Sequence, residues 1–212
     1  MIKAVLFDSW GTLLENGVFP SPVKQVQRIL NIRLAFSEYI TKFEHVFMLG
    51  KYSSLRDAFE EVAKEFDVPA KPFIIDKLVG MWNKNMLLAK PFPEAVEVLT
   101  RLKKDHKLAF VSNTDPFSIG PVLEKFDLRK HFNVIACSYE VGYLKTDRQM
   151  FEHVLRKLAV KKNEAVMVGD SMESDIAPAE AYGVKAVLVD RRGTRDNANK
   201  VANLSELDKF LK

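Results

Sequence analysis

The chain contains 212 residues, 47% of them hydrophobic, which is enough for one full domain and a smaller one, each with its own core. Lysine and arginine exceed aspartate and glutamate by only 32 to 28, and their scattered positions argue against nucleic-acid binding. Because no apolar stretch approaches the ~18 residues of a membrane span and Cys137 is the single cysteine, we expect a cytoplasmic protein without disulfides or membrane contacts. The composition predicts no particular oligomeric state.

The first predicted element is a buried strand over residues 3–7, which delivers Asp8 to a glycine-containing loop. The stretch from about residue 15 to residue 89 contains no strand pattern, and its apolar residues recur at helical spacing. Ser21 and Ser54 are predicted to cap the first and third helices of this stretch. Apolar positions of the four expected helices are Val23, Val26 and Leu30, then Ile40, Phe43 and Phe47, then Leu55, Ala58, Phe59 and Val62, then Ile75, Leu78 and Trp82. We interpret residues 15–89 as an all-α cap inserted into the rest of the chain.

After the insertion, strand and helix patterns alternate. Further buried strands are predicted over Leu108–Val111, Val134–Cys137, Ala165–Val168 and Val184–Val189. Helical patterns cover residues 93–99, 116–126, 149–158 and 175–181, and Gly183 is expected to end the last of them. This alternation predicts a doubly wound, Rossmann-like α/β core with a parallel sheet, formed by residues 1–14 and 90–212.

Polar side chains follow the end of each predicted strand. Asp8 follows the first, Ser112 and Asn113 follow the second, Ser138 and then Lys145 follow the third, and Asp170 and Asp175 follow the fourth. The carboxyl ends of parallel strands meet at one edge of a sheet, so we expect these side chains to converge there.

In this order the strand-end motifs resemble those of the haloacid dehalogenase (HAD) superfamily of hydrolases. The first family motif is Asp-x-Asp-Gly-Thr, and the chain has Asp8-Ser9-Trp10-Gly11-Thr12. The second motif is a serine or threonine after an apolar strand, which Ser112 matches. The resemblance covers about residues 1–14 and 90–190 and implies that the helical insertion is the family's α-helical cap.

The third and fourth motifs extend the resemblance. The third family motif, Gly-x-x-Lys-Pro, corresponds to Gly142-Tyr143-Leu144-Lys145, with Thr146 in place of the proline. The fourth, Gly-Asp-Ser with an acid downstream, corresponds to Gly169-Asp170-Ser171 and Asp175.

The resemblance implies that Asp8 is a nucleophile that attacks phosphorus and forms an aspartyl phosphate, which divides hydrolysis into two easier steps. Mg²⁺ prefers oxygen ligands, and the implied ligands are the side chains of Asp8 and Asp170 and the backbone carbonyl of Trp10. Asp175 is expected to orient water molecules or a neighbouring lysine.

Three further residues are expected to act on the phosphoryl group. Ser112, with Asn113 in the following loop, is predicted to hold its oxygens. Lys145 is predicted to bind the same group and to offset the negative charge of the nucleophile and the transition state.

Trp10 stands where the family's phosphatases carry a second acid, which protonates the leaving alcohol and then activates water. A tryptophan side chain offers only an N–H donor, and losing a general acid typically costs ~10²–10⁴ in rate. Three interpretations stay open: a leaving group that needs no proton, as in the family's metal-independent 2-haloacid dehalogenases; a different acid from the cap or the substrate; or a non-catalytic ligand-binding or regulatory relative.

Asp170 favours a phosphatase over a dehalogenase. Its charge beside that of Asp8 would repel a haloacid carboxylate unless a cation lay between them. We therefore predict a Mg²⁺-dependent phosphatase acting on a small phosphate monoester, with metal-independent 2-haloacid dehalogenation as the alternative.

Overall fold

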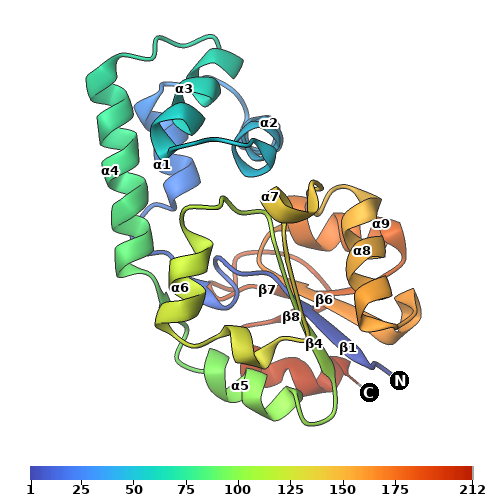
Figure 1. Cartoon of the computed structure of the whole chain (residues 1–212). Coiled ribbons are helices and arrows are strands. Elements are labelled where there is room, and N and C mark those ends of the chain that lie inside the picture. Colours follow the sequence, from blue (N-terminus) through green and yellow to red (C-terminus); the bar gives the residue numbers. More distant parts are fainter. Residues whose placement is uncertain (212) are drawn as a thin grey trace.

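The structure is a computed structural model that describes residues 1–211, and its centre is a six-stranded parallel sheet (Figure 1). Neighbouring strands follow the order β5-β4-β1-β6-β7-β8. The strands are β1 (Ala4–Phe7), β4 (Lys107–Ser112), β5 (Val134–Cys137), β6 (Ala165–Gly169), β7 (Lys185–Val189) and β8 (Lys200–Val201). The predicted doubly wound α/β fold is confirmed. β8 was not predicted because two residues carry no recognisable pattern.

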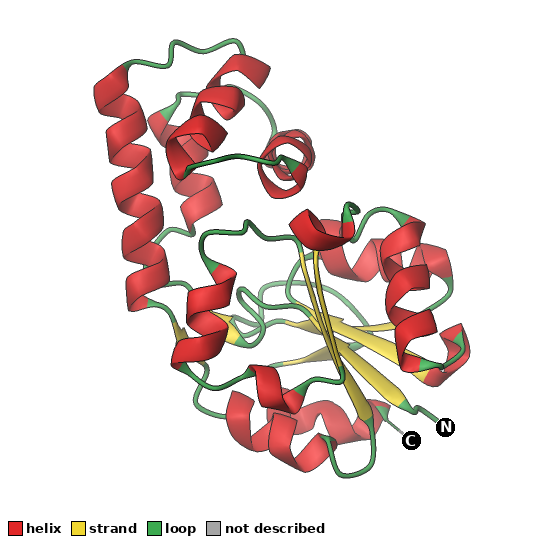
Figure 2. Cartoon of the chain, viewed as in Figure 1, coloured by secondary structure: helices red, strands yellow, loops and turns green. Residues whose placement is uncertain are grey.

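Helices cover both faces of the sheet, which is why its strands are apolar on both sides (Figure 2). In β1, Val5 and Phe7 join one core cluster, whereas Ala4 and Leu6 join the other. The first cluster is covered by α5 (Ala95–Leu102), α6 (Ile119–Lys125) and the 3-10 segment η4 (Leu204–Phe210), and the second by α8 (Arg148–Leu158) and α9 (Ala177–Tyr182).

The register of the central strands brings their carboxyl ends level. Phe7, the last residue of β1, pairs with Phe110 of β4 on one side and with Val168 of β6 on the other. The loops that follow β1, β4 and β6 therefore begin within a few residues of one another at the same edge of the sheet.

Between residues 15 and 90 the chain forms four helices, which lie together above the sheet in Figure 1. They are α1 (Pro22–Ile29), α2 (Phe36–Leu49), α3 (Leu55–Glu65) and α4 (Pro72–Leu88). Two short strands, β2 (Leu14–Glu15) and β3 (Lys90–Pro91), pair antiparallel where the chain leaves and re-enters the sheet region. The helices share a core cluster of their own, which also includes Leu144 from the loop after β5.

Local chemistry explains where several helices begin and end. The Ser54 hydroxyl accepts a hydrogen bond from the Asp57 N–H at 3.2 Å, so its predicted cap is confirmed, whereas the Ser21 side chain makes no such bond. Helix α6 begins at Ile119 instead of residue 116, because an Asp115 carboxylate oxygen accepts two backbone N–H groups in a turn. Gly183 has φ +89° and ends α9 as predicted.

The remaining helical segments are short connections. They are η1 (Arg129–His131), α7 (Ser138–Val141), η2 (Lys162–Glu164) and the single π-helical turn η3 (Met172–Ile176). Across residues 1–211, no helix combines the length and the apolar character needed to cross a membrane.

Candidate active site

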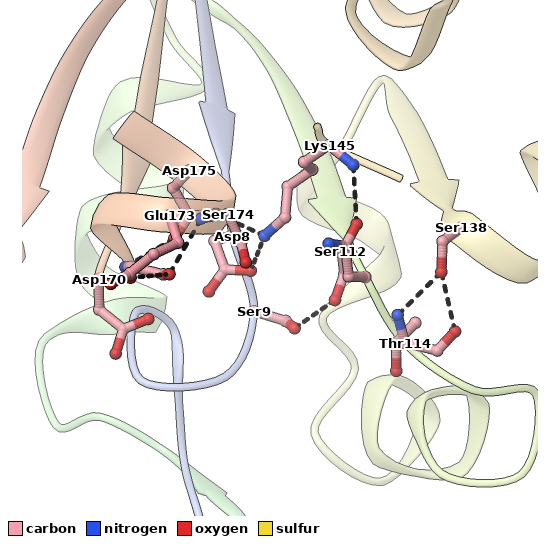
Figure 3. A network of polar contacts seen from close by, with 12 residues as sticks. Asp8, Ser9, Ser112, Thr114, Ser138, Lys145, Asp170, Glu173, Ser174 and Asp175 are labelled. Carbon is pink, nitrogen blue, oxygen red and sulfur yellow. Dashed lines mark hydrogen bonds and ion pairs between the residues drawn. The ribbon is translucent and has the colours of Figure 1, made fainter. Parts of the chain in front are cut away.

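At the carboxyl edge of the sheet, one lysine lies between two carboxylates (Figure 3). Lys145 Nζ is 2.5 Å from Asp8 Oδ1 and 2.5 Å from Asp175 Oδ1. The three side chains are only 3%, 8% and 1% exposed, respectively. Burial acts to lower the pKa of Lys145, but the charges of Asp175 and Asp8 outweigh it and raise the pKa. The lysine is therefore a permanent cation that binds the two acids together.

A third carboxylate completes an acidic cluster at this edge. Oxygen atoms of Asp8, Asp170 and Asp175 all lie within 4.8 Å of one another. Two glycines make the close approach possible: a Cβ on Gly11 would lie 2.3 Å from Asp170 Oδ2, and one on Gly169 would lie 2.3 Å from the Asp175 carboxylate. Gly11 also has φ +85°, which favours glycine. Gly11 and Gly169 thus each leave room for an acid.

Electrostatics show that the cluster disfavours having all three of its carboxyl groups ionised at once. Burial, and then the charge of Asp175, raises the pKa of Asp8, although Lys145 opposes the shift. Burial, and then the charges of Asp8 and Asp175, raises the pKa of Asp170. Buried carboxylates with hard oxygen donors and too few cations are the setting in which proteins bind a divalent metal ion. The donors present therefore fit a metal ion.

The loop after β4 connects the first and third motifs. Ser112 Oγ lies 2.6 Å from Ser9 Oγ, and both hydroxyls are buried. Asn113 Oδ1 accepts a hydrogen bond from the backbone N–H of Lys145 at 2.9 Å. Ser138 Oγ accepts the N–H of Thr114 at 3.0 Å, which fixes the same loop to the end of β5 (Figure 3). These bonds join the loops that follow β1, β4 and β5.

Comparison with known proteins agrees with this arrangement. The family described as haloacid dehalogenase-like hydrolases matches residues 2–183, which is most of the chain. The chain belongs to this family. The resemblance inferred from the motifs is confirmed, and the protein is a HAD-like hydrolase.

Relatives with assigned names extend the comparison. A glyceraldehyde 3-phosphate phosphatase from Methanothermobacter thermautotrophicus is 28% identical and covers 100% of both chains. One of the same name from Methanocaldococcus jannaschii is 25% identical over 89% of this chain and 85% of its own.

Solved structures share the fold. The crystal structure of a HAD phosphatase from Thermococcus onnurineus has 26% identity and a TM-score of 0.65, covering 99% of this chain and 98% of that one. A 2-haloacid dehalogenase from Pseudomonas syringae has 22% identity and a TM-score of 0.67, covering 100% of this chain and 98% of its own, and shows the shared fold alone.

Trp10 is the departure of this HAD-like hydrolase from the family's first motif. Its side chain is partly buried and packs against the core cluster that contains Phe7 and Leu14. Of the residues predicted for the site, the three acids have oxygen atoms within 4.8 Å of one another and Lys145 pairs with Asp8 and Asp175. Ser112 and Asn113 are joined to this group through Ser9 and the Lys145 backbone. The Trp10 side chain instead packs against the hydrophobic core, and its indole supplies no acidic proton.

Two residues at this edge were not predicted from the sequence. Arg191, after β7, donates to the carbonyl of Thr12 at 2.8 Å and pairs with Glu94 at 2.7 Å, so it secures the loop after β1. Glu44, on α2, accepts hydrogen bonds from Asn113 Nδ2 at 2.9 Å and from Ser174 Oγ at 3.1 Å. The only signal for Glu44 was its place beside the buried face formed by Phe43 and Phe47.

Glu44 is a partly buried carboxyl with a raised pKa. Burial raises its pKa from the usual 4.5 to about 7, although the charge of Lys145 and the hydrogen bonds from Asn113 and Ser174 oppose the shift. At pH 4 this carboxyl is protonated in the folded and the unfolded chain alike. Above its folded pKa, the folded protein holds a charge that burial disfavours, so Glu44 subtracts stability as the pH rises from about 4.5 to about 7.

Replacing Glu44 with glutamine is therefore expected to stabilise the protein at pH 8, by roughly 1–3 kcal/mol, and to have little effect at pH 4. Urea unfolding in EDTA across this pH range measures the difference in free energy of unfolding. Glu38, an exposed acid of the same helix, provides the matched control Glu38→Gln. A Glu44→Gln difference that is the same at pH 4 and pH 8 would show that Glu44 has an ordinary pKa.

Proposed function

We propose that this HAD-like hydrolase is a Mg²⁺-dependent phosphatase that acts on a small phosphate monoester through an aspartyl phosphate on Asp8. The observation that carries the proposal is Asp170, which adds a third carboxyl group beside Asp8 and Asp175, the two acids that already share Lys145. The names of two relatives support it, since both specify glyceraldehyde 3-phosphate, a small phosphate monoester.

In the proposed reaction, a carboxylate oxygen of Asp8 attacks phosphorus while the bond from phosphorus to the leaving alcohol breaks. Water then attacks phosphorus and the bond from phosphorus to Asp8 breaks. Inorganic phosphate is released and the Asp8 carboxylate is restored. Lys145 favours the ionised form of Asp8 in its buried site and offsets charge that develops on the phosphoryl oxygens. Ser112 and Asn113 orient those oxygens from the loop after β4.

Asp8, Asp170 and the Trp10 carbonyl are the proposed ligands of Mg²⁺, with Asp175 orienting Lys145 beside them. A bound Mg²⁺ supplies positive charge that offsets the repulsion between the acidic cluster and an anionic substrate. Gly11 supports this assignment, because it lets Asp170 approach the loop that carries Trp10.

We also propose that residues 15–89 act as the cap of a core formed by residues 1–14 and 90–212. Contacts from three residues of α2 and α4 to the strand-end loops support this role. Glu44 binds Asn113 and Ser174, the Met48 carbonyl accepts the Ser138 hydroxyl at 2.7 Å, and Trp82 Nε1 donates to Ser118 at 2.9 Å. A cap in this position excludes water and restricts the site to small substrates.

Trp10 supports one second candidate, the metal-independent 2-haloacid dehalogenase, because a halide leaves without a proton. The same Asp8 would attack carbon instead of phosphorus. Asp170 argues against this candidate, since its ionised form would oppose the carboxylate of a haloacid.

Phosphate release is expected to require Mg²⁺ and to stop when EDTA removes it. The measurement is release of phosphate from p-nitrophenyl phosphate and from glyceraldehyde 3-phosphate, and of chloride from 2-chloropropionate, each with Mg²⁺ and with EDTA. Chloride release that persists in EDTA, without any phosphate release, would establish the dehalogenase instead.

A binding readout accompanies this screen. Mg²⁺ at about 100 times its Kd is expected to stabilise the protein by about 2.7 kcal/mol, because it binds the folded chain. The variant Asp170→Asn removes one proposed ligand and should lose most of this stabilisation. Equal stabilisation of both proteins by Mg²⁺ would place the ion elsewhere.

A further inference from the structure

The proposed phosphatase reaction lacks a proton donor at its usual place. An alkoxide leaving group needs a proton, and the water that attacks the aspartyl phosphate needs a base. The Trp10 side chain has neither an acidic proton nor a free position, because it packs against the hydrophobic core. If the chain hydrolyses alkyl phosphates, another residue must carry the proton.

Glu44 lies at a position from which it could transfer this proton. Asn113 follows β4 and Ser174 follows β6, and these two strands are the neighbours of β1 on either side. A carboxylate that binds both loops therefore spans the end of β1, where Asp8 lies. Within residues 1–211, Glu44 is the only carboxylate of α1–α4 with a hydrogen bond to the loops that follow β4 and β6.

Independent contacts hold Glu44 in this place. One turn further along α2, the Met48 carbonyl accepts the buried Ser138 hydroxyl at 2.7 Å. On both sides of Glu44 along the helix, Phe43 and Phe47 pack inside the helical core. The position of the carboxylate therefore follows from the packing of α2, and its two hydrogen bonds aim it at the strand ends.

We propose that Glu44 is the general acid and base of this site and replaces the acid that the first motif lacks. The proposal rests on the proposed phosphatase function. In the first step the protonated Glu44 carboxyl gives its proton to the leaving oxygen as the bond from phosphorus to that oxygen breaks. In the second step the Glu44 carboxylate takes a proton from the attacking water as the bond from phosphorus to Asp8 breaks. Glu44 ends each turnover protonated, as it began.

The charges around Glu44 suit both roles. Lys145 favours its carboxylate form, Asp175 favours its acid form, and the neutral groups of Asn113 and Ser174 favour the carboxylate. Burial outweighs these effects and raises the pKa of Glu44 to about 7, so both forms are populated near neutral pH. A group with this balance can give a proton in one step and accept one in the next.

The test compares Glu44→Gln with the wild-type protein on two leaving groups. With glyceraldehyde 3-phosphate, whose alkoxide needs a proton, kcat should fall by ~10²–10⁴ without a burst. With p-nitrophenyl phosphate, whose phenolate leaves unprotonated, the variant should release a rapid burst of about one p-nitrophenolate per active site and then turn over slowly. The burst reports an aspartyl phosphate that forms but is hydrolysed slowly without its base.

Two further variants separate catalysis from structure. Glu44→Asp keeps the acid and should retain more activity than Glu44→Gln, and Trp10→Asp in the Glu44→Gln background should restore part of the alkyl-phosphate activity. Glu38→Gln, on the same helix, is the control and should behave as wild type.

Three outcomes would overturn the proposal. If Glu44→Gln keeps full alkyl-phosphate activity while Asp8→Asn is inactive, Glu44 is not the general acid and base, and the phosphatase function still holds. An equal loss with both substrates and no burst, or a rise in KM alone, assigns Glu44 to substrate contact or cap closure. Absence of phosphate release by the wild type removes the phosphatase function and the role of Glu44 together.

Discussion

Asp8→Asn is expected to abolish phosphate release, with a loss of roughly 10⁴-fold or more in kcat, because an amide does not form the acyl phosphate. The substitution keeps the size of the side chain and removes a charge from a cluster of three buried or partly buried carboxylates. The metal-free variant should therefore be as stable as the wild type, or more so. Phosphate release and thermal unfolding, measured side by side, separate loss of chemistry from loss of fold.

The matched control is Asp105→Asn, which makes the same chemical change at an exposed turn before β4. It should leave activity and stability within experimental error of the wild type. If Asp8→Asn kept its activity, Asp8 would not be the nucleophile, and the sequence match of the first motif would concern structure alone.

Lys145→Met is expected to lower the free energy of unfolding by about 3–5 kcal/mol, because it leaves Asp8 and Asp175 buried without their cation. Activity should also fall, since the same lysine offsets charge at the proposed transition state. Urea unfolding in EDTA measures the stability change without a contribution from bound metal.

Two companion variants make this result specific. Lys145→Met combined with Asp175→Asn removes one of the two unpaired buried charges and should recover part of the lost stability. Lys104→Met, at an exposed position, should change stability by no more than about 0.5 kcal/mol. Unchanged unfolding of Lys145→Met would mean that the two carboxylates are accommodated by protonation or by water.

The parallel core was predictable because its strands are recognisable apolar runs and polar residues follow those runs in the sequence. Asp8 and Lys145 are far apart in the sequence, but both follow strand patterns, and parallel strands place their carboxyl ends at one edge. β2, β3 and β8 escaped prediction because each has two residues, too few to show a period. The four-residue helix α7 escaped for the same reason.

Glu44 could not be placed from the sequence, because its position depends on how one helix of the insertion faces the sheet. Helical spacing indicates that Phe43 and Phe47 point into a core, and it leaves the direction of their neighbour undetermined. The same limit applies to Arg191, which follows β7 and whose partners, Thr12 and Glu94, lie far away in the sequence. Side chains whose roles arise from packing between distant elements carry no local signal.

Leu144 connects the third motif to the hydrophobic core of the helices α1–α4. It directly precedes Lys145 in the third motif, yet its side chain is 4% exposed and belongs to the core of the helices α1–α4. Withdrawing the helices from the sheet would return this side chain to water, at a cost of up to about 1.5–3 kcal/mol. For the proposed cap, this burial would disfavour an open state by up to roughly 10- to 100-fold, and we expect the exchange of substrate and phosphate to limit turnover together with bond breaking.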